Sequence, residues 1–336
     1  MSVERLERLA AAVRGQADLL IVPHNDPDPD AIASAVALSY LLREAFQAPS
    51  RIVYGGIIGR AENRALATYL NAPLEPLIGA LPDQHPILLV DTQPTVGNNP
   101  LRATSRLLGA IDHHPIAGQP SAVYLDLRPE IGATATIITE YFTSVGLAFT
   151  KQLATALFYG IKTDTLCLAR RVSQADVAAF VQLQPFVDQT GLYQIEQAQV
   201  SADYFLALHA ALETTRRYGD VLITDIGPMA YPDWTAEVAD WLLRLEGVQW
   251  VICLGNFDNT LYLSIRTRHV RGGAGKLAQT IVGRQGSAGG HGLMAGGQIP
   301  LRTRSAAQVA AKLRRRILGQ FDLPLDSLGR PLMPSV

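Results

Sequence analysis

The chain has 336 residues, which is enough for two domains of ordinary size. Its formal net charge is −1, from 29 Lys and Arg against 30 Asp and Glu. Proteins that wrap long nucleic acids normally carry a clear basic excess, so we expect no long duplex as a partner, whereas short anionic ligands remain compatible with the composition.

No apolar run reaches the roughly 18 to 20 residues that a membrane helix needs, so we expect no membrane partner. The start, MSVERLERLAAAVRG, has the pattern of an amphipathic helix and lacks the apolar centre of a secretory signal. The two cysteines, Cys167 and Cys253, lie far apart in the sequence. The sequence therefore predicts a cytoplasmic protein without disulfide bonds.

Short apolar runs alternate with helical patterns through the first half of the chain. This alternation predicts an α/β fold with a mostly parallel sheet and helices on both of its faces. Ligands of such sheets bind beyond the carboxyl ends of the strands. The predicted strands are 18–22, 51–56, 85–91 and 106–112, and the predicted helices are 30–46, 133–146, 151–164 and 173–187.

A long helical pattern at 197–217 separates two parts of the chain that differ in their sequence patterns, and we interpret it as a helical linker. We therefore predict a first domain at 1–196 and a second, smaller α/β domain at 218–336. The strands predicted for the second domain are 219–227, 248–255 and 259–267, and its helices are 233–245 and 305–318.

The loop after the first predicted strand, PHNDPDPDA (23–31), combines one histidine with three carboxylates. Clustered carboxylates raise one another's pKa unless a cation compensates their charge. His24, Asp28 and Asp30 form an H-x-x-x-D-x-D pattern, for which we expect a divalent metal ion. Asp30 taken alone is better explained as a cap of the helix that follows.

Three later motifs place similar residues at the ends of predicted strands and helices. Asp91 ends the strand in LLVDTQP, and Asp112, His113 and His114 end the next strand in IDHHP. Asp164 ends a helical pattern in GIKTDT. An isolated aspartate at such a position is more often a turn residue, so these residues gain their significance from the whole set.

The motifs HNDPDPDA, VDT, DHH and GIKTDT, in this order, resemble those of the DHH phosphoesterase superfamily. This superfamily includes RecJ-like exonucleases, nanoRNases, cyclic-dinucleotide phosphodiesterases and family II pyrophosphatases. GSAGGHGLMAGG (286–297) resembles the G-G-H signature of the DHH-associated C-terminal domain. The resemblance spans nearly the whole chain. It implies a catalytic domain, a substrate-binding domain and an active site in the cleft between them.

The resemblance also implies a role for each residue of the motifs. Mn²⁺ is the expected metal, with Mg²⁺ as the alternative, because mixed imidazole and carboxylate ligands suit Mn²⁺ better than an all-oxygen magnesium site does. Asp112 would orient a histidine, and His114 would face the substrate phosphate, so both are assigned to catalysis. The expected ligands are His24 and Asp28 for one ion, Asp30, His113 and Asp164 for a second, and Asp91 for both.

The second domain should hold the substrate. Gly289 and Gly290 would let backbone N–H groups approach a phosphate or a base, and His291 would add a donor. Arg266 in LYLSIRT is our candidate for a phosphate clamp, with Ser264 as a weaker companion. The alternatives are simple turn geometry for the glycines and a surface position for Arg266.

The sequence thus predicts a two-metal phosphodiesterase that hydrolyses short oligonucleotides or dinucleotides to 5′-mononucleotides by metal-activated water. The alternatives are a 3′-phosphonucleotide (pAp) phosphatase, a cyclic-dinucleotide phosphodiesterase and a nucleotide-binding sensor without activity. Family II pyrophosphatases share the four metal motifs, but we rank this function low. A pyrophosphatase would need a denser clamp of Lys and Arg residues in its C-terminal half, and that family lacks the G-G-H signature. A homodimer is plausible by family analogy.

Overall fold

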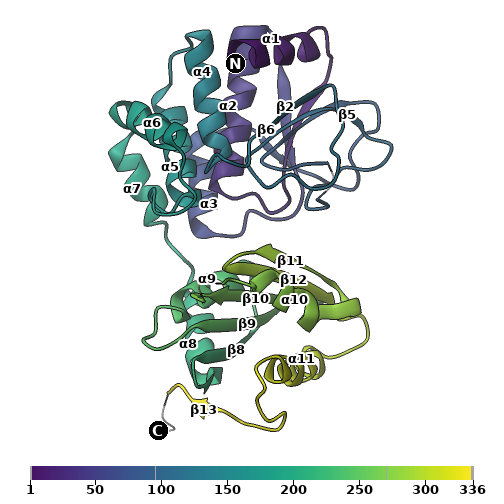
Figure 1. The fold of residues 1–336 in the computed structure, drawn as a ribbon, viewed down its shortest axis with the longest axis vertical. Coiled ribbons are helices and arrows are strands. Elements are labelled where there is room, and N and C mark those ends of the chain that lie inside the picture. Colours follow the sequence, from purple (N-terminus) through teal and green to yellow (C-terminus); the bar gives the residue numbers. More distant parts are fainter. Residues whose placement is uncertain (1, 95, 270, 334–336) are drawn as a thin grey trace. The chain divides into compact units, whose positions relative to one another are not determined.

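The structure, a computed structural model, describes residues 2–94, 96–269 and 271–333. The chain divides into two compact units, Met1–Gln199 and Val200–Val336 (Figure 1). Among the described helices, none has the length and apolar character that would allow it to cross a membrane.

The first unit is built on a six-stranded sheet with the strand order β3-β2-β1-β4-β5-β6, and every neighbouring pair is parallel. This confirms the predicted parallel α/β sheet. The strand order reverses between β1 and β4. The elements are α1 (Ser2–Val13), β1 (Leu19–Pro23), α2 (Pro29–Phe46), β2 (Ser50–Tyr54), α3 (Ala61–Leu70), β3 (Leu74–Pro76), β4 (Pro86–Val90), β5 (Arg106–Asp112), β6 (Tyr124–Leu127), α4 (Thr134–Val145), α5 (Lys151–Asp164), α6 (Gln174–Leu183), η1 (Gln184–Phe186) and α7 (Gln189–Glu196).

The two faces of this sheet are covered differently. Side chains alternate between the faces along each strand, so Ile21 of β1 packs into one core cluster and Leu20 into another. The cluster around Ile21 contains buried residues from all seven helices of the unit. The cluster around Leu20 is completed from loops, by Leu77, Leu81 and Leu101.

The structure therefore differs from the expectation of helices on both faces, since within the described residues the second face is covered by loops. The segments that supply these side chains, 77–85 and 96–105, form no helix. They are also rich in Pro, Gly and Asn, which favour turns over helices.

The second unit contains a mixed, seven-stranded sheet with the order β11-β12-β10-β9-β8-β7-β13, in which β8 and β9 are parallel and the other pairs are antiparallel. This confirms a second sheet domain. Its elements are α8 (Ala202–Thr214), β7 (Arg216–Tyr218), β8 (Val221–Pro228), α9 (Trp234–Leu242), β9 (Trp250–Phe257), β10 (Thr260–Thr267), α10 (Ala274–Val282), η2 (Gly283–Gln285), β11 (Ser287–His291), β12 (Met294–Pro300), α11 (Ala306–Gln320) and β13 (Arg330–Pro331).

Helices cover both faces of this second sheet. Cys253 of β9 packs in a cluster with residues of α8 and α9, whereas its neighbour Leu254 packs in a cluster with residues of α10 and α11. The segment 197–217, predicted as a linker, contains α8. Ala207 and Ala211 of this helix are buried, and the helix packs on β8, so α8 is part of the core of the second unit.

Candidate metal centre

The central strands of the first sheet end at residues of the predicted site. His24 directly follows β1, Asp91 directly follows β4, and Asp112 is the last residue of β5. Because the strand order reverses between β1 and β4, this edge of the sheet is where an open α/β fold normally binds its ligand. Asp91 has a φ of 58°, an unfavourable backbone angle for a residue other than glycine.

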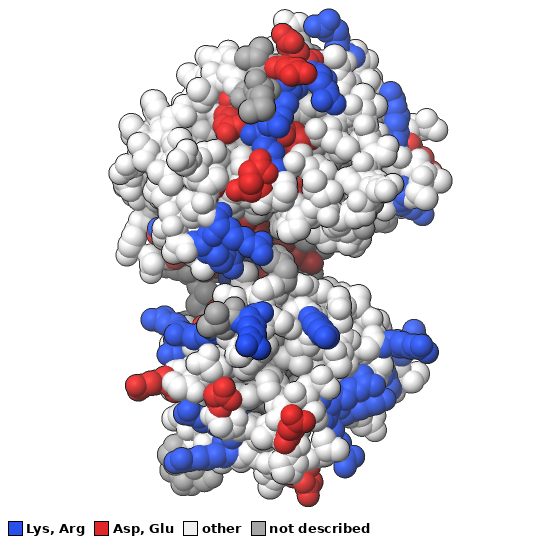
Figure 2. Space-filling view, in the orientation of Figure 1, with Lys and Arg blue, Asp and Glu red and all other residues white. Residues whose placement is uncertain are grey.

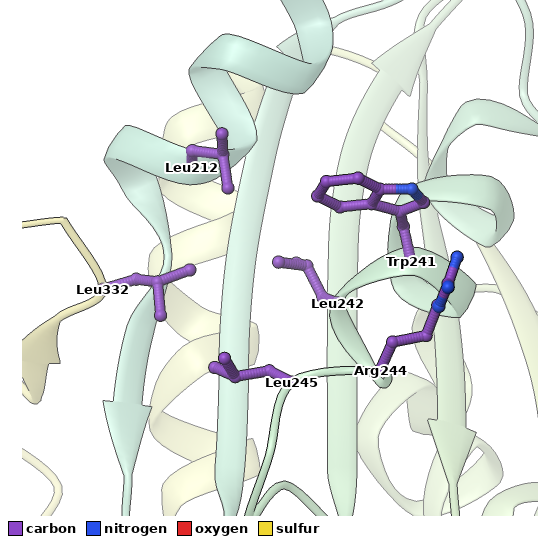
Figure 3. Close-up of a pocket in the computed structure, with 6 residues that line it drawn as sticks. All are labelled: Leu212, Trp241, Leu242, Arg244, Leu245 and Leu332. Carbon is purple, nitrogen blue, oxygen red and sulfur yellow. The ribbon is translucent and has the colours of Figure 1, made fainter.

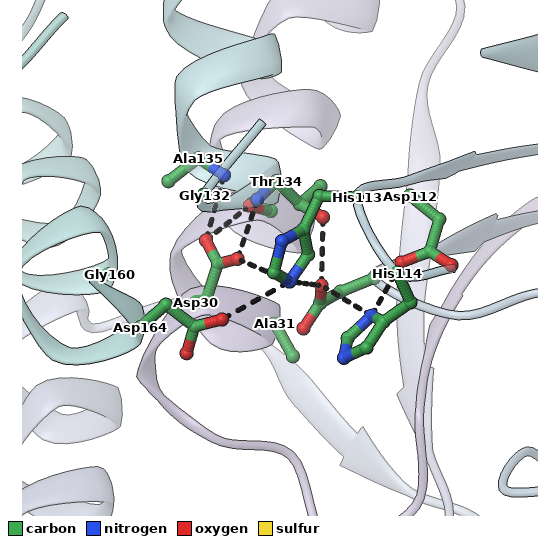
Figure 4. A network of polar contacts seen from close by, with 12 residues as sticks. Asp30, Ala31, Asp112, His113, His114, Gly132, Thr134, Ala135, Gly160 and Asp164 are labelled. Atoms are coloured by element: carbon green, nitrogen blue, oxygen red, sulfur yellow. Dashed lines mark hydrogen bonds and ion pairs between the residues drawn. The ribbon is translucent and has the colours of Figure 1, made fainter. Parts of the chain in front are cut away.

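Side chains from several elements converge at this edge into three overlapping groups. Within each group, the candidate ligand atoms lie within 4.8 Å of one another. In Figure 4 the ring of His113 points between Asp30 and Asp164, and His114 lies beside it. The structure thus brings together all six residues predicted as ligands and His114. The groups are His24, Asp28 and Asp91; Asp30, His113 and Asp164; and Asp91, His113 and His114.

Two of the histidines have their ring orientation fixed by backbone carbonyls. Nδ1 of His24 lies 2.8 Å from the carbonyl oxygen of Asn25, and Nδ1 of His113 lies 3.2 Å from that of Ile131. A carbonyl oxygen only accepts hydrogen bonds, so each Nδ1 carries the proton. In the neutral ring, Nε2 then keeps its lone pair, as a metal ligand requires.

Both Nε2 atoms face carboxylates. Nε2 of His24 lies 3.7 Å from Oδ1 of Asp28 and 3.5 Å from Oδ2 of Asp91. Nε2 of His113 lies 3.1 Å from Oδ2 of Asp164 and 3.5 Å from Oδ1 of Asp91. A lone pair that faces anionic oxygens needs a proton or a metal ion between them.

Two buried atoms of this group, Oδ2 of Asp91 and Nε2 of His113, make no well-aligned hydrogen bond among the described residues and have only the ion-pair contacts given above. Buried polar atoms are normally satisfied, and an exception calls for a physical reason. Divalent cations bound beside His24 and beside His113 would satisfy these two atoms. The donor set, the orientation of the imidazoles and these two unsatisfied atoms together fit a metal site.

The electrostatics of the metal-free site show the same excess of negative charge. Burial raises the pKa of Asp30 well above its ordinary value, and the nearby Asp91 and Asp164 raise it further. Burial acts to raise the pKa of Asp91 too, but the surrounding histidines lower it below its ordinary value. Burial acts to lower the pKa of His24, but Asp28 and Asp91 raise it well above 6.5. Protonated imidazoles therefore balance the carboxylates when no metal ion is bound.

Asp30 is held by the beginning of α4. Its Oδ2 accepts a 2.6 Å hydrogen bond from the N–H of Thr134, and its Oδ1 accepts a 2.7 Å hydrogen bond from the N–H of Ala135 (Figure 4). A helix N-terminus favours a carboxylate at this place. The sequence left Asp30 as a possible N-cap of α2. The N-cap is instead Asp28, whose Oδ1 accepts a 3.0 Å hydrogen bond from the N–H of Ala31.

Asp112 lies behind His114. Its Oδ1 is 2.8 Å from Nδ1 of His114, and its Oδ2 accepts a 2.7 Å hydrogen bond from the side-chain amide of Gln93. Asp112 is fully buried, whereas the side chain of His114 is 35% exposed. The carboxylate therefore fixes the orientation of a ring that solvent can reach.

Two buried polar residues of this site, Gln93 and Thr134, were not predicted from the sequence. The Gln93 amide binds Asp112 and also the carbonyl oxygens of His114 and Pro115, each at 3.2 Å. Thr134 binds Asp30 through its N–H and Asp91 through its hydroxyl. The proximity of Gln93 to the VDT motif is the one sequence signal that could have drawn attention to it.

In the second unit, the predicted phosphate clamp is engaged with protein groups. Arg266 is 8% exposed, and its Nε donates a 2.5 Å hydrogen bond to Oδ1 of Asp240. Its Nη1 donates to the carbonyl oxygen of Ile265 at 3.1 Å. The hydroxyl of Ser264 lies 2.9 Å from that of Thr235. Both side chains face α9, so a phosphate would compete with Asp240 for the guanidinium group of Arg266.

The Gly-rich stretch folds as the hairpin of β11 and β12 at one edge of the second sheet. Gly290 has a φ of 143°, and a Cβ there would lie 2.4 Å from the carbonyl oxygen of Met294, so the fold itself requires this glycine. A Cβ at Gly289 would meet nothing within 4 Å, which leaves this backbone open to a ligand. The side chain of His291, also predicted to bind substrate, lies outside the described part of the chain.

A separate pocket of about 370 Å³ lies on the second unit. In Figure 3, Leu212 and Leu332 face Trp241 and Arg244 across it. Its other lining residues are Leu242 and Leu245. The lining is apolar apart from Arg244 and contains none of the predicted site residues, so its chemistry does not suit a phosphate.

Comparison with known proteins agrees with the geometry of the metal centre. Residues 18–161 match the DHH family, N-terminal domain. This segment is a DHH-family domain. The DHH domain covers the loops that carry His24, Asp91, His113 and His114, and it ends within α5, three residues before Asp164. The predicted DHH family is thereby confirmed for residues 18–161.

Two relatives extend the comparison. An uncharacterised protein of Methanocaldococcus jannaschii is 34% identical over 303 residues, which are 90% of this chain and 62% of that protein. A protein of Streptococcus agalactiae named probable manganese-dependent inorganic pyrophosphatase is 28% identical over 160 residues, which are 47% of this chain and 51% of that protein. The chain thus spans less than two thirds of either relative.

A crystal structure of an exopolyphosphatase-related protein from Bacteroides fragilis has the same fold. It matches with a TM-score of 0.69 over 97% of this chain and 98% of that chain, at 15% sequence identity. At this identity, the likeness supports the fold and says nothing of the substrate.

Proposed function

We propose that the DHH-domain protein is a metal-dependent phosphohydrolase that uses two divalent ions, with Mn²⁺ as the expected metal. The observation that carries this proposal is the position of Asp91. Its Oδ2 lies 3.5 Å from Nε2 of His24, and its Oδ1 lies 3.5 Å from Nε2 of His113. One buried carboxylate therefore connects two groups of candidate ligands, as a bridging ligand between two ions would.

The two groups would hold one ion each. When bound, divalent ions supply an activated water and offset negative charge on phosphoryl oxygens. The choice of Mn²⁺ is supported by the mixture of imidazole and carboxylate ligands and by the similarity to a protein named a manganese-dependent pyrophosphatase. The proposed ligands are His24, Asp28 and Asp91 for one ion and Asp30, Asp91, His113 and Asp164 for the other.

His114 is proposed to bind the substrate phosphate. Its Nδ1 is held by Asp112, so a substrate oxygen would be met by Nε2. A donor in this position can stabilise charge on a phosphoryl oxygen or protonate the leaving oxygen. Asp112 and Gln93 would act through His114 by fixing the direction of its ring.

The proposed substrates are short oligonucleotides or dinucleotides, which would be hydrolysed to 5′-mononucleotides. The resemblance of the hairpin at 286–297 to the G-G-H signature of the DHH-associated C-terminal domain supports this choice. A basic stretch also supports it, because residues 259–321 contain no Asp or Glu. Figure 2 shows Lys and Arg side chains gathered on the second unit. The basic residues of the stretch are Arg266, Arg268, Arg271, Lys276, Arg284, Arg302, Arg304, Lys312, Arg314, Arg315 and Arg316.

Inorganic pyrophosphate is the second candidate substrate. It is favoured by the 28% identity to the Streptococcus agalactiae protein over 160 residues. Hydrolysis of either candidate substrate requires the same metal centre. The two substrates differ in the chemical groups that the second unit would have to bind. Because a pyrophosphatase needs no contact with a base or sugar, the two candidates separate cleanly in a substrate assay.

The test is product analysis with Mn²⁺ on 5′-labelled di- to pentaribonucleotides, pAp, cyclic di-AMP and pyrophosphate, with Asp91→Asn as the inactive control. We expect mononucleotides from the short oligomers with the wild-type protein and none with the variant. Rapid hydrolysis of pyrophosphate alone would establish the second candidate. No hydrolysis by the metal-loaded protein would contradict an enzymatic function.

A further inference from the structure

Arg170 lies in the loop that follows α5, and its side chain contacts the end of that helix. Its Nη2 donates a 3.1 Å hydrogen bond to the carbonyl oxygen of Asp164. The carboxylate of the same Asp164 lies 3.1 Å from Nε2 of His113. The guanidinium group of Arg170 is therefore adjacent to the proposed metal ligands.

The loop that carries Arg170 is held in one tight conformation. The carbonyl oxygen of Thr165 accepts hydrogen bonds from the N–H groups of Ala169 and Arg170, each at 2.9 Å, and the Thr165 hydroxyl accepts from the N–H of Leu168 at 3.0 Å. Leu166, Cys167 and Leu168 have φ angles of 49°, 55° and 63°. Three consecutive left-handed residues are unfavourable without glycine, so the surrounding contacts must impose this turn.

The same loop packs on the segment that orients His113. A Cβ at Gly132 would lie 2.6 Å from the carbonyl oxygen of Arg171, so the loop and this segment are in direct contact. The preceding residue, Ile131, supplies the carbonyl oxygen that holds Nδ1 of His113. The position of Arg170 is thus fixed relative to the metal centre through a contact inside the first unit.

Arg170 has a donor that the protein does not use. Its Nε is buried and has no hydrogen-bond partner among the described residues. A buried N–H without an acceptor is unfavourable, and a guanidinium group matches the oxygens of a phosphate. We propose that Arg170 binds a phosphoryl oxygen of the substrate beside the metal centre. The inference rests on the proposed phosphohydrolase function and adds a substrate-binding residue to it.

The competing explanation is purely structural. An arginine that donates to the last carbonyl of a helix stabilises that helix end, and Arg170 does so at Asp164 of α5. If Arg170 had only this role, its loss would lower the stability of the protein and displace Asp164, which would weaken metal binding. Substrate affinity would then fall only as far as metal affinity falls. The two explanations therefore predict different measurements.

The experiment compares Arg170→Gln and Arg170→Lys with the matched control Arg171→Gln, because Arg171 is the next residue and is exposed. We would measure KM and kcat, Mn²⁺ affinity, and the affinity of the Mn²⁺-loaded protein for inorganic phosphate. In Arg170→Gln we expect about a tenfold or larger increase in KM and in the Kd of phosphate, as for the loss of a charged hydrogen bond. Mn²⁺ affinity should stay within about twofold. Arg170→Lys should lie between Arg170→Gln and wild type, and Arg171→Gln should match wild type.

Wild-type KM and phosphate affinity in Arg170→Gln would overturn the inference. A loss of Mn²⁺ affinity as large as the loss of phosphate affinity would also overturn it, in favour of the structural role. If the wild-type protein hydrolyses no substrate but binds phosphate, the proposed function fails, and the phosphate affinities of the variants still decide the role of Arg170. A wild-type protein that neither hydrolyses a substrate nor binds phosphate would overturn both.

Discussion

The hydroxyl of Thr134 donates a 2.8 Å hydrogen bond to Oδ1 of Asp91. The backbone N–H of the same threonine donates to Oδ2 of Asp30 at 2.6 Å. Thr134 is fully buried in the first turn of α4. One residue thus fixes two proposed metal ligands that come from the end of β4 and the start of α2.

Thr134→Val should weaken Mn²⁺ binding by about tenfold to a hundredfold, the usual effect of removing a residue that orients a ligand. Valine keeps the shape and the backbone N–H, so only the hydrogen bond to Asp91 is lost. Thr134→Ser keeps the hydroxyl and should retain most of the affinity. Titration with Mn²⁺, followed by electron paramagnetic resonance, measures both. Equal affinities in the two variants would show that the hydroxyl plays no part.

Gly290→Ala should destabilise the second unit by about 2–5 kcal/mol, since it combines an unfavourable φ with a steric clash. The φ is 143°, and the added Cβ would lie 2.4 Å from the carbonyl oxygen of Met294. Gly289→Ala is the matched control, because its Cβ would have nothing within 4 Å. Urea denaturation should therefore separate the two variants. A control as unstable as Gly290→Ala would contradict the observed packing of the hairpin.

Arg128→Met should destabilise the first unit by about 3 kcal/mol, because the buried Asp126 loses its bidentate partner and keeps only the 3.6 Å ion pair with Arg5 and the hydrogen bond from Tyr141. Nε and Nη2 of Arg128 bind the two carboxylate oxygens of Asp126 at 2.8 and 2.7 Å, and both residues are buried. The double variant Asp126→Asn with Arg128→Met should recover part of the loss. Arg51→Met breaks the exposed ion pair with Glu75 and should leave the urea midpoint unchanged. Similar midpoints for Arg128→Met and Arg51→Met would contradict the prediction.

The stability of the metal-free protein should fall as the pH rises. The pKa values of His24 and His113 are raised well above 6.5 in the folded state. Their contribution to stability is therefore complete below about pH 6.5 and is lost as the pH rises through the raised values. A metal ion needs neutral imidazoles, so the stabilisation by Mn²⁺ should grow over the same range. Thermal denaturation in EDTA and in Mn²⁺, from about pH 6 to 9, measures the difference in stability between the metal-free and the metal-loaded protein. A stability difference that does not change with pH would contradict the prediction.

The central strands and the cluster of candidate ligands could be predicted from the sequence, because both leave a local signal. Apolar runs such as 18–22 and 85–91 coincide with β1 and β4, and the charged motifs directly follow them. The sequence also left two functions open for Asp30, and the structure resolves this choice: Asp28 caps α2, and Asp30 lies at the beginning of α4.

Features that depend on distant partners could not be predicted. Arg266 lies 26 residues from Asp240, its ion-pair partner, and no local pattern relates the two. Gln93 and Thr134 are ordinary polar residues in the sequence and gain their roles only when the fold buries them beside Asp112 and Asp91. The hairpin at 286–297 lacks the alternation of apolar side chains that normally reveals a strand, because much of it is glycine.

The measurement that tests the paired metal centre most directly is the number of Mn²⁺ ions bound per chain, together with their magnetic coupling. A bridging Asp91 predicts two ions with a spin-coupled paramagnetic resonance signal in the wild-type protein. Asp91→Asn should abolish the coupling and leave at most one ion. A wild-type protein that binds a single isolated Mn²⁺ ion, or none, would contradict the proposed centre.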